Sequence, residues 1–336
     1  MITATNPSTQ AVPLPDWRQG LREAVTDAGE LLALVGLPHL AGRLPAGDAG
    51  FPLKVTRSFI RRMHKGDPND PLLLQVLPVL AELDEVPGFS DDAVGDLDAV
   101  QAHGVLHKYA GRALLIAAGS CAINCRYCFR RHFPYAEELA AAHAWHAAVD
   151  CLAADTSIRE VILSGGDPLV LSTAKLKDLT DALRDLPHVT RLRIHSRLPV
   201  VLPERIDAAL CDWLSALPLQ RVLVLHANHA HELDGDVAAA CARLHAAGVT
   251  LFNQSVLLRG VNDNATALVD LSERLFALGV LPYYLHQLDR VRGTAHFEVP
   301  DTRARELMDE VRARLPGYLV PRLVRELPGD DAKRPV

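Results

Sequence analysis

From residue 112 to residue 315 the sequence alternates short apolar runs with amphipathic helical patterns, and no other feature constrains the fold as strongly. Six such strand–helix repeats predict an α/β fold with a parallel sheet and right-handed crossovers. An open, six-unit partial (β/α) barrel fits this count better than a closed eight-unit barrel. The expected strands cover 112–118, 160–164, 191–196, 221–226, 250–256 and 281–287, and the expected helices cover 136–153, 173–186, 203–217, 232–247, 265–278 and 301–315.

The first hundred residues differ from these repeats. Segments 17–35 and 72–83 carry apolar residues at helical spacing, and the turn-rich segments 51–55 and 65–71 lie between them. The region shows no obvious catalytic constellation. We therefore expect a helical N-terminal region over 1–100, a partial barrel over 101–318 and a separate C-terminal segment over 319–336.

Three cysteines follow the first expected strand with the spacing C-x3-C-x2-C, namely Cys121, Cys125 and Cys128. Structural zinc normally takes four protein ligands, often from two C-x2-C pairs, and the sequence has no second pair. Three thiolates instead suit a 4Fe–4S cluster in which one iron stays open to another ligand. The remaining three cysteines lie singly in apolar helical patterns, which is typical of buried, inert thiols.

Polar residues gather where the other expected strands end. In parallel barrels this face carries the active site, so the clustering predicts one site built from several strand ends. A tight turn capped by an aspartate would also explain Gly165-Gly166-Asp167, and a zinc site would be an alternative for the histidines near residue 226. The clusters are Gly165-Gly166-Asp167, His195-Ser196-Arg197, His226 with Asn228 and His229, Asn253-Gln254-Ser255, and His286-Gln287-Leu288-Asp289.

Composition narrows the possible partners. The net charge of -6 and the pI near 6.2 argue against a general nucleic-acid-binding protein, which would usually be basic over its contact face. No apolar run is long enough to span a bilayer, and no signal peptide is apparent. We therefore expect a cytoplasmic enzyme with no nucleic-acid or membrane partner.

Several segments together resemble one family, the lysine 2,3-aminomutases, which are radical S-adenosylmethionine enzymes. The chain looks most like the shorter branch that makes (R)-β-lysine for the modification of elongation factor P. Segment 65–71 and the abrupt C-terminus support that branch. The segments that carry the resemblance are 106–112, 125–133, 163–168, 253–263 and 282–284.

The resemblance implies three cofactors: a 4Fe–4S cluster on the three cysteines, S-adenosylmethionine and pyridoxal 5′-phosphate. In this family a 5′-deoxyadenosyl radical takes hydrogen from Cβ of lysine, the amino group migrates from Cα to Cβ, and the hydrogen then returns. Lys333 aligns with the lysine that bonds to pyridoxal phosphate, although Asp330, Asp331 and Ala332 replace the usual glycines before it. The remaining residues implied to bind cofactors are Lys108 and Arg112 at the pyridoxal phosphate, and Gly165, Gly166, Asp167, Ser196, Arg197, His226 and Gln254.

The resemblance also assigns the substrate contacts. Arg130 matches the arginine that binds the substrate carboxylate, and Asp289 matches one of two acids that bind the ε-ammonium group. Glu326 stands at the second acidic position, where classical enzymes have aspartate. The extra methylene displaces that carboxylate by about 1 Å, a displacement that can lower the rate on the order of a hundredfold unless the pocket adapts.

Two hypotheses compete with an aminomutase for elongation factor P modification. Within enzymes, the chain could be a catabolic or osmolyte-forming lysine 2,3-aminomutase. Outside enzymes, an iron–sulfur or zinc protein could use the three cysteines only to staple a loop. The elongation factor P hypothesis implies L-lysine as substrate, an electron donor such as flavodoxin or ferredoxin, and a functional link to an elongation factor P lysine ligase.

Overall fold

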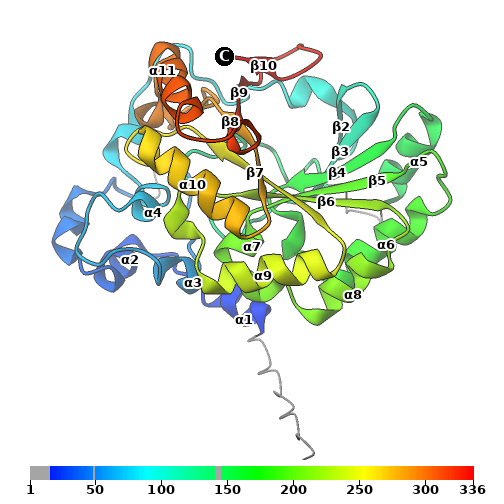
Figure 1. Ribbon diagram of the computed structural model, residues 1–336, viewed down its shortest axis with the longest axis horizontal. Helices are drawn as coiled ribbons and strands as arrows, with labels where there is room; N and C mark the ends of the chain where they lie inside the picture. The colour runs from blue at the N-terminus through cyan, green and yellow to red at the C-terminus, as the bar shows by residue number, and fades with distance from the viewer. Residues whose placement is uncertain (1–15, 48–49, 141–144) are drawn as a thin grey trace, which may run out of the picture.

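One ten-stranded sheet forms the centre of the computed structural model, which describes residues 16–47, 50–140 and 145–336 (Figure 1). The strands follow one another in chain order, and β3 to β9 all pair in parallel. Among the described strands the order runs from β1 to β10 without closing, so the predicted open barrel is confirmed. The strands are β1 (Val100–Ala102), β2 (Val105–Tyr109), β3 (Arg112–Ala118), β4 (Glu160–Gly165), β5 (Arg191–Ser196), β6 (Gln220–His226), β7 (Thr250–Val256), β8 (Leu281–His286), β9 (Arg322–Arg325) and β10 (Arg334–Pro335).

All six expected strands are present, and a helix follows each of them. Several of these helices begin at a side-chain cap: the side chains of Ser172, Asp207, Asp234 and Asn264 each accept a hydrogen bond from the first helical turn. No helix in the described part of the chain is long and apolar enough to span a membrane. The helices are α5 (His146–Ala154), α6 (Thr173–Leu183), α8 (Ala208–Ala216), α9 (Gly235–Ala246), α10 (Ala265–Ala277) and α11 (Asp301–Arg312).

The helix expected over 136–153 is shorter than predicted. Residues 136–140 form turns, residues 141–144 lie outside the described chain, and α5 begins at His146. Likewise, the expected helix over 203–217 is divided into a 3-10 turn, η6 (Pro203–Arg205), and α8. The other short elements after β4 are η5 (Pro168–Val170), α7 (Leu198–Val201), η7 (Ala230–Glu232), η8 (Ala295–Phe297) and η9 (Gly317–Leu319).

The N-terminal region contains short helices joined by extended segments rather than the two long helices expected. Segment 17–35 breaks because Val25 forms an isolated β-bridge with Val55 and Asp27 then caps a new helix. Buried residues of this region, including Leu31 and Phe59, belong to the same hydrophobic core as Leu163 of β4. The helices are α1 (Trp17–Arg22), α2 (Ala28–Leu34), η1 (Pro38–Arg43), α3 (Arg57–Ile60), α4 (Pro71–Leu74), η2 (Leu80–Leu83) and η3 (Leu97–Ala99).

The C-terminal segment is part of the central sheet. Strand β9 pairs in parallel with β8, and β10 turns back to pair antiparallel with β9. Figure 1 shows this tail, in red, above the end of the sheet formed by β7 and β8. The turn between β9 and β10 carries Lys333 back toward Glu326, whose side chain binds the lysine.

Candidate active site

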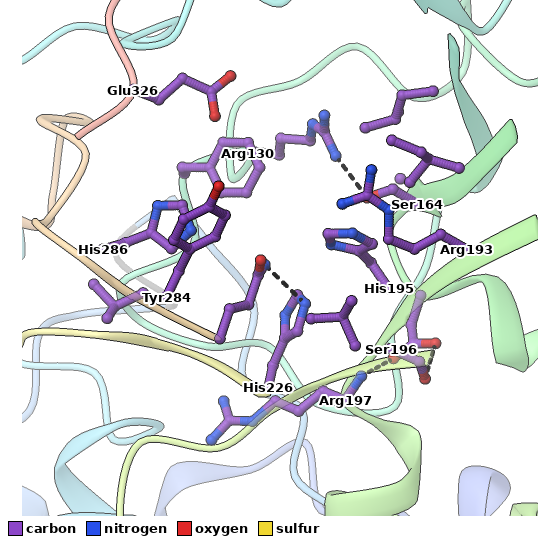
Figure 2. A pocket seen from close by; sticks show the side chains of 18 of the residues that line it. Arg130, Ser164, Arg193, His195, Ser196, Arg197, His226, Tyr284, His286 and Glu326 are labelled. Atoms are coloured by element: carbon purple, nitrogen blue, oxygen red, sulfur yellow. Dashed lines mark hydrogen bonds between the residues drawn. The ribbon is translucent and has the colours of Figure 1, made fainter. Parts of the chain in front are cut away.

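A cavity of about 820 Å³ occupies the inner face of the sheet. Alternate residues of β4, β5, β6 and β7 line it, for example Glu160, Ile162 and Ser164 of β4, as the two-residue period of a strand requires. Figure 2 shows side chains from opposite walls converging on this space, with Glu326 and Tyr284 facing Arg130 and Arg193. Every site residue proposed from the sequence lines this cavity: Lys108, Arg112, Cys121, Cys125, Cys128, Arg130, Gly165, Gly166, Asp167, Ser196, Arg197, His226, Gln254, Asp289, Glu326 and Lys333.

The three cysteines lie on the loop that follows β3, and all three are partly buried free thiols. Burial and the charge of Cys125 raise the pKa of the Cys128 thiol to about 11, and burial also raises the pKa of Cys121. Thiolates therefore form here only when a nearby cation compensates for their charge, as iron does. The Arg197 guanidinium donates a hydrogen bond of 2.6 Å to Cys125 Sγ and supplies part of that positive charge. This donor set fits an iron–sulfur cluster.

Two glycines at the C-terminal end of β4 pack against the end of β3 and the start of the cysteine loop. Gly165 has a φ of 115°, which favours glycine, and a Cβ there would lie 2.7 Å from the Ala118 carbonyl oxygen. A Cβ on Gly166 would lie 2.4 Å from the Ser120 carbonyl oxygen. The Asp167 backbone N–H also donates a hydrogen bond to the Ser120 carbonyl oxygen, which holds the two segments together. The glycines thus bring the β4 turn against the loop that would hold the cluster.

We expect the substitution Gly166→Ala to destabilise the apoprotein by about 1–3 kcal/mol, because the added methyl group overlaps backbone atoms that cannot rotate away. The measurement is urea unfolding followed by circular dichroism. Gly235→Ala is the matched control, since a Cβ at Gly235 meets no atom within 4 Å. An unfolding midpoint for Gly166→Ala equal to that of wild type would contradict this packing.

Asp167 is buried and joins the ends of two strands. Its carboxylate accepts hydrogen bonds from the Ser196 hydroxyl at 2.7 Å and from the backbone N–H groups of Leu169, Arg197 and Leu198. Burial raises the pKa of the Asp167 carboxyl to about 6, although these hydrogen bonds oppose the shift. Much of its acceptor capacity therefore serves to fix the β5 end, a second role besides the ligand contact expected from the sequence.

Arg197 is the centre of a buried polar network that begins in the N-terminal region. Its guanidinium donates to Gln75 Oε1 at 2.6 Å and to Glu232 Oε2 at 2.9 Å, in addition to Cys125. Asn228 also donates to Gln75 Oε1. The N-terminal region, which shows no obvious catalytic constellation in the sequence, therefore contributes Gln75 to the support of an arginine in the cavity wall.

Next to Arg197, His226 and Gln254 form a neutral polar wall. The Gln254 amide nitrogen lies 2.9 Å from His226 Nε2 and donates to it. Burial, together with the positive charges of Arg197 and Lys333, lowers the pKa of His226 to about 3. The imidazole is therefore uncharged at neutral pH and acts as a hydrogen-bonding group rather than as a cation.

A chain of alternating charges crosses the cavity from Arg130 to Lys333. Arg130 Nε lies 2.6 Å from Asp96 Oδ2, Lys108 Nζ lies 2.6 Å from Asp96 Oδ1, and Glu326 Oε1 lies 3.0 Å from Lys108. The other Glu326 oxygen accepts a hydrogen bond from Lys333 Nζ. Burial alone would raise the pKa of Glu326, but the two ammonium groups lower it to about 2. Glu326 is therefore ionised throughout the physiological range.

Sequence reasoning missed Asp96, which binds both Arg130 and Lys108. No motif marks this residue, since it lies in a turn-rich stretch of the N-terminal region. The one feature of the sequence that could have indicated an acid here is the pair of cations, Arg130 and Lys108, since each requires a partner of opposite charge when it is buried. Because Lys108 is paired with two acids, Arg112 is the less engaged of the two cations proposed for the cofactor phosphate; its guanidinium packs 4.6 Å from the Tyr109 ring centroid.

Asp289 is the clearest acceptor that the described residues leave unsatisfied in the cavity. Its Oδ1 atom is buried and has no hydrogen-bond partner among them, and His286 Nε2 on the same strand end is in the same situation. Burial and the charge of Glu326 raise the pKa of the Asp289 carboxyl to about 7. A cation bound beside it would satisfy the oxygen and stabilise the ionised form.

Comparison with known proteins identifies the family. A family model described as a 4Fe-4S single cluster domain matches residues 110–191. The chain is 49% identical over 340 residues to an L-lysine 2,3-aminomutase of Escherichia coli (strain K12), covering 100% of this chain and 97% of that protein.

Two further relatives carry the same name. An L-lysine 2,3-aminomutase of Haemophilus influenzae is 45% identical over 95% of this chain and 94% of its own length. One of Clostridium subterminale is 34% identical over 96% of this chain and 77% of its own length. The chain therefore belongs to the lysine 2,3-aminomutases, radical S-adenosylmethionine isomerases that use a 4Fe–4S cluster and pyridoxal phosphate.

Proposed function

We propose that this enzyme converts L-α-lysine to (R)-β-lysine and that the product modifies elongation factor P. The observation that carries the substrate assignment is the position of the Lys333 ammonium group, which binds Glu326 Oε2 and lies 6.0 Å from the Tyr284 ring centroid. The cavity thus already accommodates a lysine ammonium group. A substrate ε-ammonium has the same charge and hydrogen-bonding capacity, so it fits the same carboxylate.

Asp289 completes the acidic end of the proposed substrate site. Its unsatisfied Oδ1 and its raised pKa are what a carboxylate shows when its cationic partner is missing. Glu326 and Asp289 line the same cavity, and the charge of Glu326 helps to raise the pKa of Asp289. We propose that the ε-ammonium group binds between these two acids.

Arg130 supplies the opposite end. Its guanidinium binds Asp96 through Nε and the Ser164 hydroxyl through Nη1 at 3.0 Å. Asp96 raises the pKa of Arg130 against the effect of burial, so the arginine keeps its charge in the cavity wall. We propose that this oriented cation binds the substrate carboxylate. A zwitterionic lysine then spans the cavity from Arg130 to the acidic pair.

The remaining assignments concern the cofactors. The cluster with S-adenosylmethionine supplies a carbon radical and pyridoxal phosphate supplies an aldehyde that carries the migrating amino group. The chain itself would hold the cluster through its three cysteines, present Lys333 to the aldehyde from the β9–β10 turn, and bind the phosphate through Arg112. Gly165 to Asp167, Ser196, Arg197, His226 and Gln254 would form the wall around S-adenosylmethionine. An external reductant such as flavodoxin or ferredoxin would reduce the cluster.

The raised pKa of Asp289 predicts a pH dependence. Between pH 7 and pH 6 Asp289 becomes protonated in the free enzyme, and only the ionised carboxylate attracts the ε-ammonium group, so kcat/KM for lysine should fall severalfold over this interval. Below pH 6 the Asp167 carboxyl, with a pKa of about 6, titrates as well, so the comparison is made above that pH. Glu326 stays ionised over this range and adds no slope. The Asp289→Asn variant should have a lower kcat/KM without this slope. If kcat/KM of Asp289→Asn depended on pH as that of wild type does, the titrating group would be another residue and the prediction would be wrong.

The use of the product is tested in cells. The resemblance of segment 65–71 supports the elongation factor P branch. In a strain lacking this gene, mass spectrometry of elongation factor P should show no β-lysyl group, and the wild-type gene should restore it where Lys333→Ala does not. Free β-lysine that accumulates without any change in elongation factor P would support the catabolic or osmolyte alternative instead.

A further inference from the structure

Three metal-binding side chains lie together away from the cavity: His64, Asp70 and His231. One possible ligand atom from each lies within 4.8 Å of the other two. Two of them come from the N-terminal region around segment 65–71, and the third comes from the turn after β6. We propose that these three residues bind a first-row divalent metal ion such as Zn²⁺, at a site distinct from the iron–sulfur cluster.

The distance between Asp70 and His64 suits such an ion. His64 Nδ1 lies 3.1 Å from Asp70 Oδ2, where a proton now joins the two atoms. Two ligands of a tetrahedral zinc ion, with bonds of about 2.0–2.1 Å, lie roughly 3.3 Å apart. The ion can therefore replace the shared proton with little movement of either side chain.

Asp70 is held ready as a ligand by its own backbone contacts. The residue is fully buried, and its Oδ1 accepts hydrogen bonds from the N–H groups of Leu72 and Leu73, each at 2.9 Å. Its Oδ2 accepts one backbone hydrogen bond, from His64 at 2.9 Å, and keeps capacity for a metal bond. Such hydrogen bonds orient ligating carboxylates and limit the entropy lost on binding.

His231 closes the site from a different part of the chain. It lies in η7 (Ala230–Glu232), and its ring centroid is 4.9 Å from that of His64. The His231 backbone N–H donates to His229 Nδ1 at 3.2 Å, which fixes this turn. Both proposed imidazole ligands are exposed, so water fills the remaining coordination position. Two imidazoles and one carboxylate favour Zn²⁺, Ni²⁺ or Co²⁺ over Mg²⁺ or Ca²⁺.

The metal would join two segments that meet behind the cluster loop. Glu232, directly after His231, accepts hydrogen bonds from Gln75 and Arg197, and Arg197 contacts Cys125. An ion that links Asp70 to His231 would therefore hold Gln75 and Glu232, the two residues that bind the Arg197 guanidinium, in their positions. Bound zinc should raise the unfolding temperature, since it binds only the folded arrangement of these segments.

The test uses the holoenzyme with its cluster reconstituted, so that iron occupies the three cysteines. After equilibrium dialysis against chelator-buffered Zn²⁺, zinc and iron are counted per chain by mass spectrometry. We expect wild type to bind one zinc ion more than His64→Gln or His231→Gln, with equal iron in all three proteins. Zinc should also raise the unfolding temperature of wild type and leave that of both variants unchanged.

His39→Gln provides the control, because His39 is an exposed histidine of η1 outside this cluster. It should bind as much zinc as wild type. Equal zinc in wild type, His64→Gln and His231→Gln would overturn the proposal, as would an equal loss of zinc in His39→Gln. X-ray absorption at the zinc edge that shows sulfur ligands would also overturn it by placing the ion on cysteine.

Discussion

The Cys128→Ala variant should lose reductive cleavage of S-adenosylmethionine while it keeps its fold. The thiol lines the cavity on a loop, so its removal deletes a cluster ligand and little packing. Loss of a residue that only supports a metal ligand costs roughly 10–100-fold, and loss of the ligand itself should exceed that. The measurement is 5′-deoxyadenosine formed per reduced enzyme, together with the iron content and visible spectrum.

Cys211→Ala is the matched control, because Cys211 is a partly buried thiol of α8 that packs against the main core and does not line the cavity. It should retain the cluster and the cleavage activity. If the cysteines served only to staple the loop, Cys128→Ala would lower the unfolding temperature of the protein first. A variant with normal iron content and normal cleavage would show that the cluster lies elsewhere.

The Lys333→Ala variant should fail to isomerise lysine although its cluster remains intact. Lys333 is delivered to the cavity by the β9–β10 turn and is held there by Glu326. Without its amine the cofactor aldehyde has no covalent anchor, and misplacement of a reacting group by about 1 Å already lowers the rate on the order of a hundredfold. β-Lysine formation should therefore fall by at least that factor, with S-adenosylmethionine binding unchanged.

A second readout separates anchoring from folding. After borohydride reduction, peptide mapping of wild type should place the pyridoxyl group on Lys333, and the variant should carry none. Lys177→Ala is the control, since Lys177 is an exposed lysine of α6 paired with Asp181. If Lys333→Ala isomerised lysine at the wild-type rate, the proposed catalytic role of the C-terminal segment 319–336 would be wrong.

The sequence predicted the barrel well because burial imposes a simple pattern. Apolar runs with polar residues at their ends locate all six expected strands, and parallel pairing then brings those ends together. Motif spacing identified the three cysteines without any knowledge of the fold.

Long-range partners were not predictable in this way. The Val25–Val55 bridge breaks an expected helix, and only tertiary structure reveals it. Asp96 and Gln75 contact cavity residues that lie 34 and 122 positions away along the chain, so no local pattern marks them. Strands β9 and β10 are too short to give a periodic signal, yet their pairing places Lys333.

The most direct test of the account follows one hydrogen atom through the reduced, fully reconstituted enzyme. L-lysine deuterated at C3 is incubated anaerobically, and the recovered S-adenosylmethionine and β-lysine are analysed by mass spectrometry and NMR. We expect deuterium at C5′ of S-adenosylmethionine and at C2 of β-lysine, because the radical formed at the cysteine end must reach a lysine held between Arg130, Asp289 and Glu326. Absence of β-lysine, or β-lysine formed with no deuterium in S-adenosylmethionine, would contradict it.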